Sequence, residues 1–243
     1  MSYQSRDLNL AYEPAKGWAH FVLYTEPRHG VAHGALNGTA SIEQVTPYVR
    51  EWLGRLQRCE PNALHTTLVP NDKIPDLFHP CVYDDKDSPS AVGGSGCICH
   101  QTFLDPEFGL PVVAEHYRTV SGNIDTWKYL TYTPLDLRPQ DSFASLVLAG
   151  DQFWVRTTSG LLALLPEEHG HGYGVGYNGG GPYELAGYIS RLVESGGKDT
   201  AAGGLRRSDD APDPRILAWV SSQAADRPQE LTLEGLKRIQ QGG

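Results

Sequence analysis

Basic residues are scarce in this sequence. It contains 20 lysines and arginines against 29 aspartates and glutamates, which gives a formal charge of −9 at pH 7. Nonspecific binding to a nucleic-acid backbone depends on clustered lysines and arginines, so nucleic acid is an unfavourable partner. An acidic surface suits a basic partner instead, and one hypothesis is an immunity or antidefence-type protein that inhibits a protein partner.

Long apolar segments are missing as well. No run of about eighteen apolar residues occurs, and residues 1–14 have neither the basic nor the apolar part of a secretory signal. We therefore expect a cytoplasmic protein with no membrane partner. Four cysteines in a chain of 243 residues, with no secretory signal, predict reduced thiols rather than a disulfide framework.

The common catalytic signatures are absent too. The sequence has no Gly-x-Ser-x-Gly nucleophile motif, no His-Glu-x-x-His metal motif and no Gly-x-x-x-x-Gly-Lys-Ser/Thr phosphate loop. These absences favour a binding or interaction protein over an enzyme.

The hydrophobic pattern predicts an α+β fold. Thr46 and Pro47 begin a helix whose apolar stripe includes Val49 and Trp52. A short β-rich run is expected at 65–69, and the segment from 70 to 96 has the composition of a loop. Closely spaced β-rich runs with short turns then predict an antiparallel meander at 112–120, 127–132, 143–148, 153–157 and 161–165.

The composition changes after Gly197. Residues 198–213 contain few apolar side chains and predict a linker, while 214–243 predict a helical tail that includes Leu231. We therefore expect an α+β domain over 1–197, made of an antiparallel β-meander sheet packed by a few helices, and a C-terminal helical appendage.

A glycine-rich loop opens into a helix at residues 169–197. Proline at 182 suits a helix start, and Leu185, Ala186, Ile189, Leu192 and Val193 form one apolar face. Amides of such a loop and the helix dipole can bind an anion, which makes a small phosphorylated ligand one candidate. The glycines could equally form a tight turn under the tyrosines. The predicted site for a ligand or protein partner consists of Tyr177, Gly179, Gly180, Gly181 and Tyr183.

Two His-x-Thr patterns carry the main enzymatic alternative: His65-Thr66-Thr67 and His100-Gln101-Thr102. The pair resembles the motifs of the 2H phosphoesterases. That resemblance implies phosphoester or nucleotide processing, with His65 and His100 as general acid and base and Thr67 and Thr102 holding phosphate oxygens. The sequence departs from the family pattern because the two motifs lie close together and the segment between them has the composition of a loop.

A cluster of thiols and imidazoles supports one metal hypothesis. His79, Cys81, Cys97 and Cys99 could form a four-coordinate structural zinc site. The Cys-x-Cys spacing differs from the usual Cys-x-x-Cys, and the alternative is that these thiols bind no metal.

Overall fold

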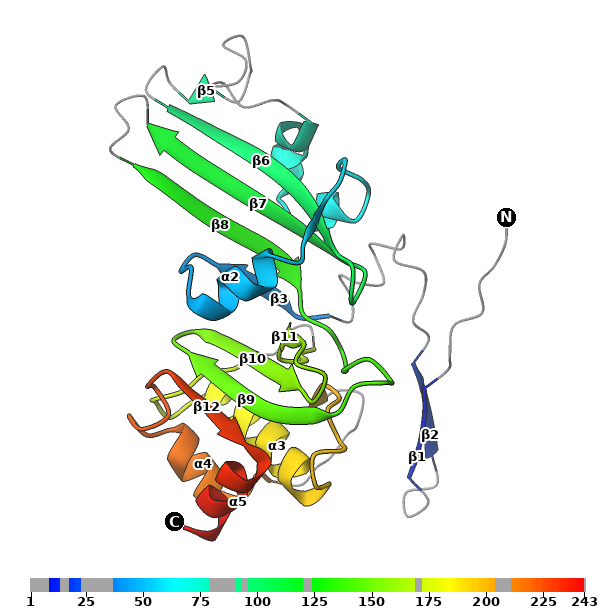
Figure 1. Cartoon of the computed structure of the whole chain (residues 1–243), viewed down its shortest axis with the longest axis vertical. Coiled ribbons are helices and arrows are strands. Elements are labelled where there is room, and N and C mark those ends of the chain that lie inside the picture. Colours follow the sequence, from blue (N-terminus) through cyan, green and yellow to red (C-terminus); the bar gives the residue numbers. More distant parts are fainter. Residues whose placement is uncertain are drawn as a thin grey trace.

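Two antiparallel sheets lie one above the other, with the helix α2 (Pro47–Leu53) between them (Figure 1). The computed structural model describes residues 9–13, 18–22, 37–78, 91–92, 96–119, 124–168, 172–203 and 211–242. The predicted α+β class, a meander packed by helices with a C-terminal helical segment, is confirmed. A separate hairpin pairs β1 (Asn9–Glu13) with β2 (Trp18–Val22).

The first sheet has the strand order β3-β8-β7-β6-β4, and β5 also pairs with β6. Its strands are β3 (Thr39–Ile42), β4 (Gln57–Arg58), β5 (Ala91–Val92), β6 (Gly96–Asp105), β7 (Leu110–Thr119) and β8 (Asp125–Tyr132). In the register of the meander, Cys99 lies opposite His116, and His116 lies opposite Trp127. Paired residues project to the same side of a sheet, so these three side chains share one face.

Short helices cover both faces of the first sheet. The 3₁₀ helices η1 (His65–Thr67) and η2 (Asn71–Phe78) flank a small core in which Val69 and Leu77 pack with Val113. Helix α2 packs on the opposite face, where Thr46 caps it by accepting the Val49 N–H at 3.2 Å.

The strand predicted at 65–69 is wrong. The Asn62 side chain accepts the Leu64 N–H at 2.9 Å and starts a local turn, from which η1 continues. Such short-range hydrogen bonds compete with sheet pairing, and here they outweigh the β preference of the two threonines.

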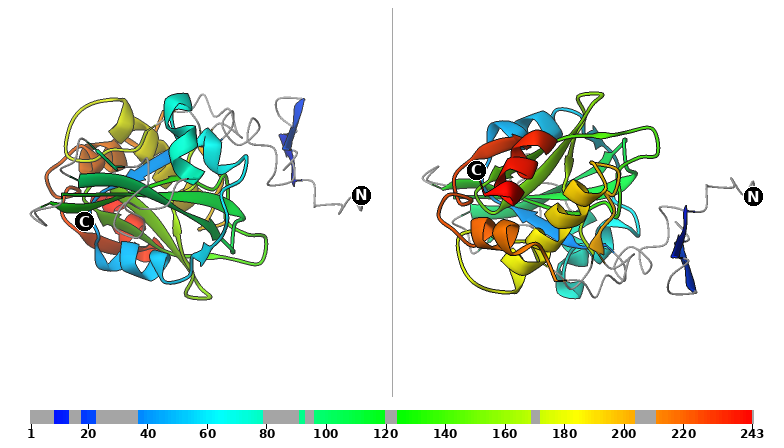
Figure 2. Two further views of the ribbon diagram at one scale, coloured as in Figure 1. Left: turned by 90° about the horizontal axis from the view of Figure 1, so that it is seen from above. Right: turned by 90° about the horizontal axis from the view of Figure 1, so that it is seen from below.

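The second sheet has the order β11-β10-β9-β12. Its strands and helices are β9 (Phe143–Ala149), β10 (Gln152–Thr157), β11 (Leu162–Leu164), α3 (Gly180–Glu194), α4 (Pro214–Val220), β12 (Gln229–Thr232) and α5 (Leu233–Gln241). The three helices lie on the outer side of this sheet (Figure 2). The predicted apolar face of α3 is buried in the main core, and the helix starts two residues before Pro182.

The C-terminal segment belongs to the same core. Ile216 and Val220 of α4 and Leu236 of α5 are fully buried there. Leu231, expected in a helix, instead lies in β12 and pairs with Leu146 of β9. The second sheet is therefore completed by a strand that follows the predicted linker.

A second cluster of buried side chains joins the two sheets. Trp52 of α2 lies 6.0 Å from Trp154 of β10 and 6.4 Å from Tyr129 of β8, measured between ring centroids. Ile42, Val112 and Val147 complete the contact between the layers. The face of the second sheet that the outer helices leave open is thus covered by α2 and the first sheet.

Candidate functional site

The glycine-rich loop is held to the core by specific contacts. Gly176 has φ +82°, a conformation that favours glycine, and its N–H donates to the Val220 carbonyl at 2.9 Å. The Tyr173 hydroxyl donates to the Pro166 carbonyl at 2.7 Å, and its ring lies edge-on to Tyr188 of α3. These contacts fix the backbone ahead of the helix.

Tyr177 lies across the glycines that the sequence singled out. A Cβ atom at Gly179 would lie 2.7 Å from the Tyr177 ring, and one at Gly181 would lie 2.7 Å from its hydroxyl. A Cβ at Gly180 would meet open space. Gly179 and Gly181 therefore provide room for the Tyr177 ring.

The predicted binding residues form a continuous segment with two exposed tyrosines. Tyr177 is 52% exposed and Tyr183, in the first turn of α3, is 46% exposed. The Tyr183 N–H donates to the Gly179 carbonyl at 3.2 Å, which ties the start of α3 to the glycines. Whether this segment binds a ligand stays a prediction.

Carboxylates outnumber basic groups near the loop. Burial is the main cause that raises the pKa of Tyr173 well above its usual value; the nearby charges of Glu167, Glu184 and Glu168 add to it, and the charge of Arg191 opposes it. The Asp226 side chain lies against Gly176, where a Cβ atom would be 3.2 Å from the Asp226 Cβ. The excess of carboxylates over basic groups near the loop disfavours a phosphorylated ligand, because phosphate is also negatively charged.

His65 is buried and both ring nitrogens are engaged. Its Nδ1 accepts the Asn62 N–H at 3.2 Å, which places the ring proton on Nε2, 3.0 Å from the Phe103 carbonyl oxygen. The pKa of His65 is lowered below its ordinary value. Burial is the main cause, and the hydrogen bond to the Phe103 carbonyl offsets part of this lowering. The arrangement holds a neutral imidazole between η1 and β6.

This neutral histidine predicts a specific pH dependence of stability. The unfolded chain protonates His65 near pH 6.5, and the folded chain does so only at lower pH. The free energy of unfolding should therefore fall as pH drops from 6.5 through the lower folded value, by at most about 1.4 kcal/mol per pH unit from this group. Urea unfolding of wild type and His65→Gln at pH 7 and pH 5 should show the smaller decrease in the variant. Equal decreases would refute a buried neutral His65.

The other residues of the two His-x-Thr patterns are also bound to protein groups. Thr67 donates its hydroxyl to the Leu64 carbonyl at 2.6 Å, and Thr102 donates to the Cys59 carbonyl at 2.6 Å. His100 Nε2 lies 3.4 Å from Glu115 Oε2, and this hydrogen bond lowers the pKa of Glu115. In the described part of the chain, His100 Nδ1 is buried without a hydrogen-bond partner.

His65 and His100 contact different groups. His65 lies at the Phe103 carbonyl and His100 at Glu115, and Phe103 is three positions from His100 on β6, about 10 Å along the strand at 3.3 Å per residue. The two-histidine phosphoesterase hypothesis stays a prediction, which these distances and hydrogen bonds do not favour.

Most of the predicted zinc cluster lies outside the described residues. This applies to His79, to Cys81 and to the side chain of Cys97. Cys99 is buried, with its Sγ 3.8 Å from His116 Nδ1. Within the described ranges, no group of three or more His, Cys, Asp and Glu side chains is placed to hold a metal ion. The zinc hypothesis stays a prediction.

His116 and its neighbours Asp125 and Trp127 were missed by the sequence-based prediction. His116 Nε2 lies 2.6 Å from Asp125 Oδ1, and the Trp127 ring is stacked on the imidazole at 3.9 Å. The only sequence signal is the period-two alternation of the strands, and it becomes useful only when the register of β6, β7 and β8 is known.

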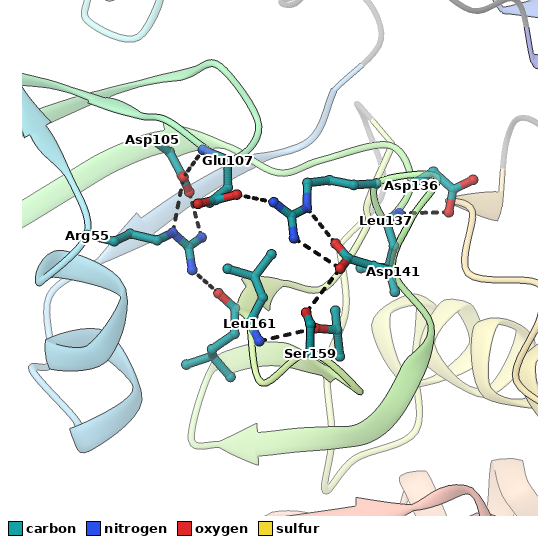
Figure 3. A network of polar contacts seen from close by, with 11 residues as sticks. Arg55, Asp105, Glu107, Asp136, Leu137, Asp141, Ser159 and Leu161 are labelled. Atoms are coloured by element: carbon teal, nitrogen blue, oxygen red, sulfur yellow. Dashed lines mark hydrogen bonds and ion pairs between the residues drawn. The ribbon is translucent and has the colours of Figure 1, made fainter.

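A further polar network ties the two sheets together (Figure 3). Asp105 accepts hydrogen bonds from Arg55 Nη2 at 2.6 Å and from Trp52 Nε1 at 3.1 Å, while Arg55 Nη1 donates to the Leu162 carbonyl. Nearby, Arg138 pairs with Glu107 and Asp141, and its hydrogen bonds lower the pKa of Asp141. Each charge in this network has an opposite charge beside it, which indicates a structural role.

Comparison with protein-family models, with curated proteins and with solved structures finds no match to this chain. Within the described ranges, no helix is both long and apolar enough to cross a bilayer.

Proposed function

We propose that this chain is a non-catalytic binding protein that recognises a positively charged protein segment through residues 172–184. The observation that carries the proposal is the pair of exposed tyrosines, Tyr177 on a loop held to the core and Tyr183 in the first turn of α3. Tyrosine is enriched at protein interfaces because its rigid ring offers a large contact area together with a hydroxyl group.

The carboxylates around the loop select the charge of the partner. Glu184 follows Tyr183 on α3, and Asp226 lies against Gly176, next to Tyr177. Lysine and arginine are attracted both to carboxylates and to tyrosine ring faces, whereas a phosphate would be repelled. The net charge of −9 would also speed association with a basic partner.

The test is a fluorescence anisotropy titration with a labelled hexa-arginine peptide and a hexaglutamate peptide of equal length. We expect the cationic peptide to bind the wild type, and a Tyr177→Ser/Tyr183→Ser variant to bind about tenfold to a hundredfold more weakly, as for central interface tyrosines. Raising the salt concentration should weaken binding, since exposed charges are screened.

Phe78 offers a matched control. It is 56% exposed on η2, so Phe78→Ser removes a similar exposed aromatic side chain from a different surface. Binding that Phe78→Ser weakens as much as the tyrosine variant would contradict the proposed site. Binding of inorganic phosphate or ATP that is lost in Gly180→Val would favour the phosphorylated-ligand alternative.

A further inference from the structure

The dipeptide Asn-Gly occurs twice in this chain, at Asn37-Gly38 and at Asn178-Gly179. In such a dipeptide the backbone nitrogen of the glycine can attack the side-chain amide of the asparagine, because glycine has no Cβ atom to hinder the approach. Asparagine is chemically labile for this reason. The fold places the two dipeptides in opposite surroundings.

The first dipeptide is held by buried hydrogen bonds. Asn37 is 6% exposed, and its side-chain N–H donates to the Thr133 carbonyl at 2.7 Å. The Gly38 N–H donates to the Glu167 carbonyl at 2.9 Å, and the Gly38 carbonyl accepts the Thr133 N–H at 2.9 Å. The nitrogen and the amide that would have to meet are therefore each bound to a different partner.

The second dipeptide is exposed in the 172–184 loop. Asn178 and Gly179 come directly before Gly180, the first residue of α3. Among the residues that the structure describes, none accepts a hydrogen bond from the Gly179 N–H, and none pairs with the Asn178 side chain. The attacking nitrogen and the amide can therefore meet without breaking a hydrogen bond.

The packing of Tyr177 requires glycine at position 179. A Cβ atom there would lie 2.7 Å from the Tyr177 ring, so a larger residue would displace the tyrosine. A larger residue would also hinder attack by its own nitrogen. The contact that places Tyr177 over the loop thus depends on the same residue that makes Asn178 labile.

We infer that Asn178 is a site of spontaneous modification, at which the side-chain amide is lost and a carboxylate is formed. The Gly179 nitrogen gives its proton to solvent and attacks Asn178 Cγ, so that a new C–N bond closes a succinimide ring. The bond between Cγ and the side-chain nitrogen breaks, and this nitrogen takes up a proton and leaves as ammonia.

Water then opens the succinimide ring at either of its carbonyl groups. Opening at Cγ gives aspartate, whereas opening at the main-chain carbonyl gives isoaspartate, in which the main chain continues through Cβ and Cγ. The sequence of steps consumes water and releases ammonia, and no group is oxidised or reduced. Each product carries one negative charge that asparagine lacks.

Both products change the surface of the 172–184 loop. The new carboxylate follows Tyr177, which is 52% exposed, and it adds to the carboxylates already near the loop. Isoaspartate also lengthens the main chain by one atom between Tyr177 and Gly179. The Tyr177 ring then loses its position over Gly179 and Gly181.

The test follows both asparagines in the same folded chain. The full-length wild type is kept at pH 8 and sampled over weeks, and loss of the amide at each asparagine is measured by peptide mass spectrometry. Conversion at Asn178 should be at least about tenfold faster than at Asn37, because Asn37 reacts only after its buried hydrogen bonds open. Both isoaspartate and aspartate should appear at position 178.

Two controls separate the effect of the fold from that of the local sequence. In urea the chain is unfolded, both dipeptides are free, and the rates at Asn37 and Asn178 should become similar. Asn178→Gln keeps an exposed amide, but its longer side chain closes a ring much more slowly. This variant should show no conversion at position 178, while Asn37 keeps its rate.

Conversion of Asn178 no faster than that of Asn37 in the folded chain would overturn the inference. Formation of aspartate at position 178 without isoaspartate would overturn the succinimide route, because it would show that water attacks the side chain directly. The measurement needs no binding partner, so its failure is distinct from a failure of the hexa-arginine titration.

Discussion

A chain that ends at residue 203 is expected to lose its cooperative unfolding transition. Truncation removes β12 from the edge of the second sheet, and from the main core it removes Ala225 and three large, fully buried side chains, Ile216, Val220 and Leu236. At about 1.5–3 kcal/mol for each large buried apolar side chain, the loss reaches about 5–9 kcal/mol. That is comparable with the entire stability of a typical domain, about 5–15 kcal/mol.

The measurement is thermal unfolding followed by circular dichroism, with size-exclusion chromatography of the truncated chain. Leu236→Ala should lower the free energy of unfolding by about 2–5 kcal/mol, and Gln241→Ala, at an exposed position of the same helix, should change it by less than about 0.5 kcal/mol. A truncated chain that melts within a few degrees of the full chain would show that residues 214–243 are a separable tail, as the sequence predicts.

Replacing Asp105 with alanine is expected to cost about 3–5 kcal/mol of unfolding free energy, because it leaves the Arg55 guanidinium without its ion pair. The Asp105 side chain is only 5% exposed and Arg55 is 17% exposed, so water replaces the lost carboxylate poorly. The Trp52 N–H loses its acceptor in the same variant, which adds the cost of an unsatisfied buried donor.

Asp105→Asn and Glu43→Ala serve as controls. Asparagine keeps one oxygen as an acceptor for Trp52 or Arg55, so Asp105→Asn should lose less stability than the alanine variant. The Lys128–Glu43 pair is exposed at both ends, and Glu43→Ala should change stability by at most about 1 kcal/mol. A loss below about 1 kcal/mol in Asp105→Ala, measured by urea unfolding, would show that the network does not hold the sheets together.

Local signals in the sequence predicted the start of α2 and the end of α3. Thr46 and Pro47 begin α2 as expected, and α3, which ends at Glu194, is followed by Gly196 and Gly197 with φ of +65° and +85°. Caps and helical periodicity involve residues close together in the chain, so they can be recognised without knowledge of the tertiary structure.

Strand pairing was harder to predict because it depends on distant residues. The strand β6 was missed, since Gly96, Cys97 and His100 have no strong β preference and pairing with β7 makes it a strand. The same cause hid the approach of Cys99 to His116, which depends on register. Tyr177 and Tyr183 could be named from the sequence because a local glycine pattern marks their segment, whereas their exposure depends on how that segment packs in the fold.

The most direct test of the proposed function is the location of the cationic peptide on the protein. Hydrogen–deuterium exchange should be measured for the wild type and for Tyr177→Ser/Tyr183→Ser, each with and without hexa-arginine. We predict that the peptide slows exchange at residues 174–183 in the wild type and that this protection is lost in the variant. Protection confined to another part of the chain, or equal protection in the variant, would contradict the proposed site.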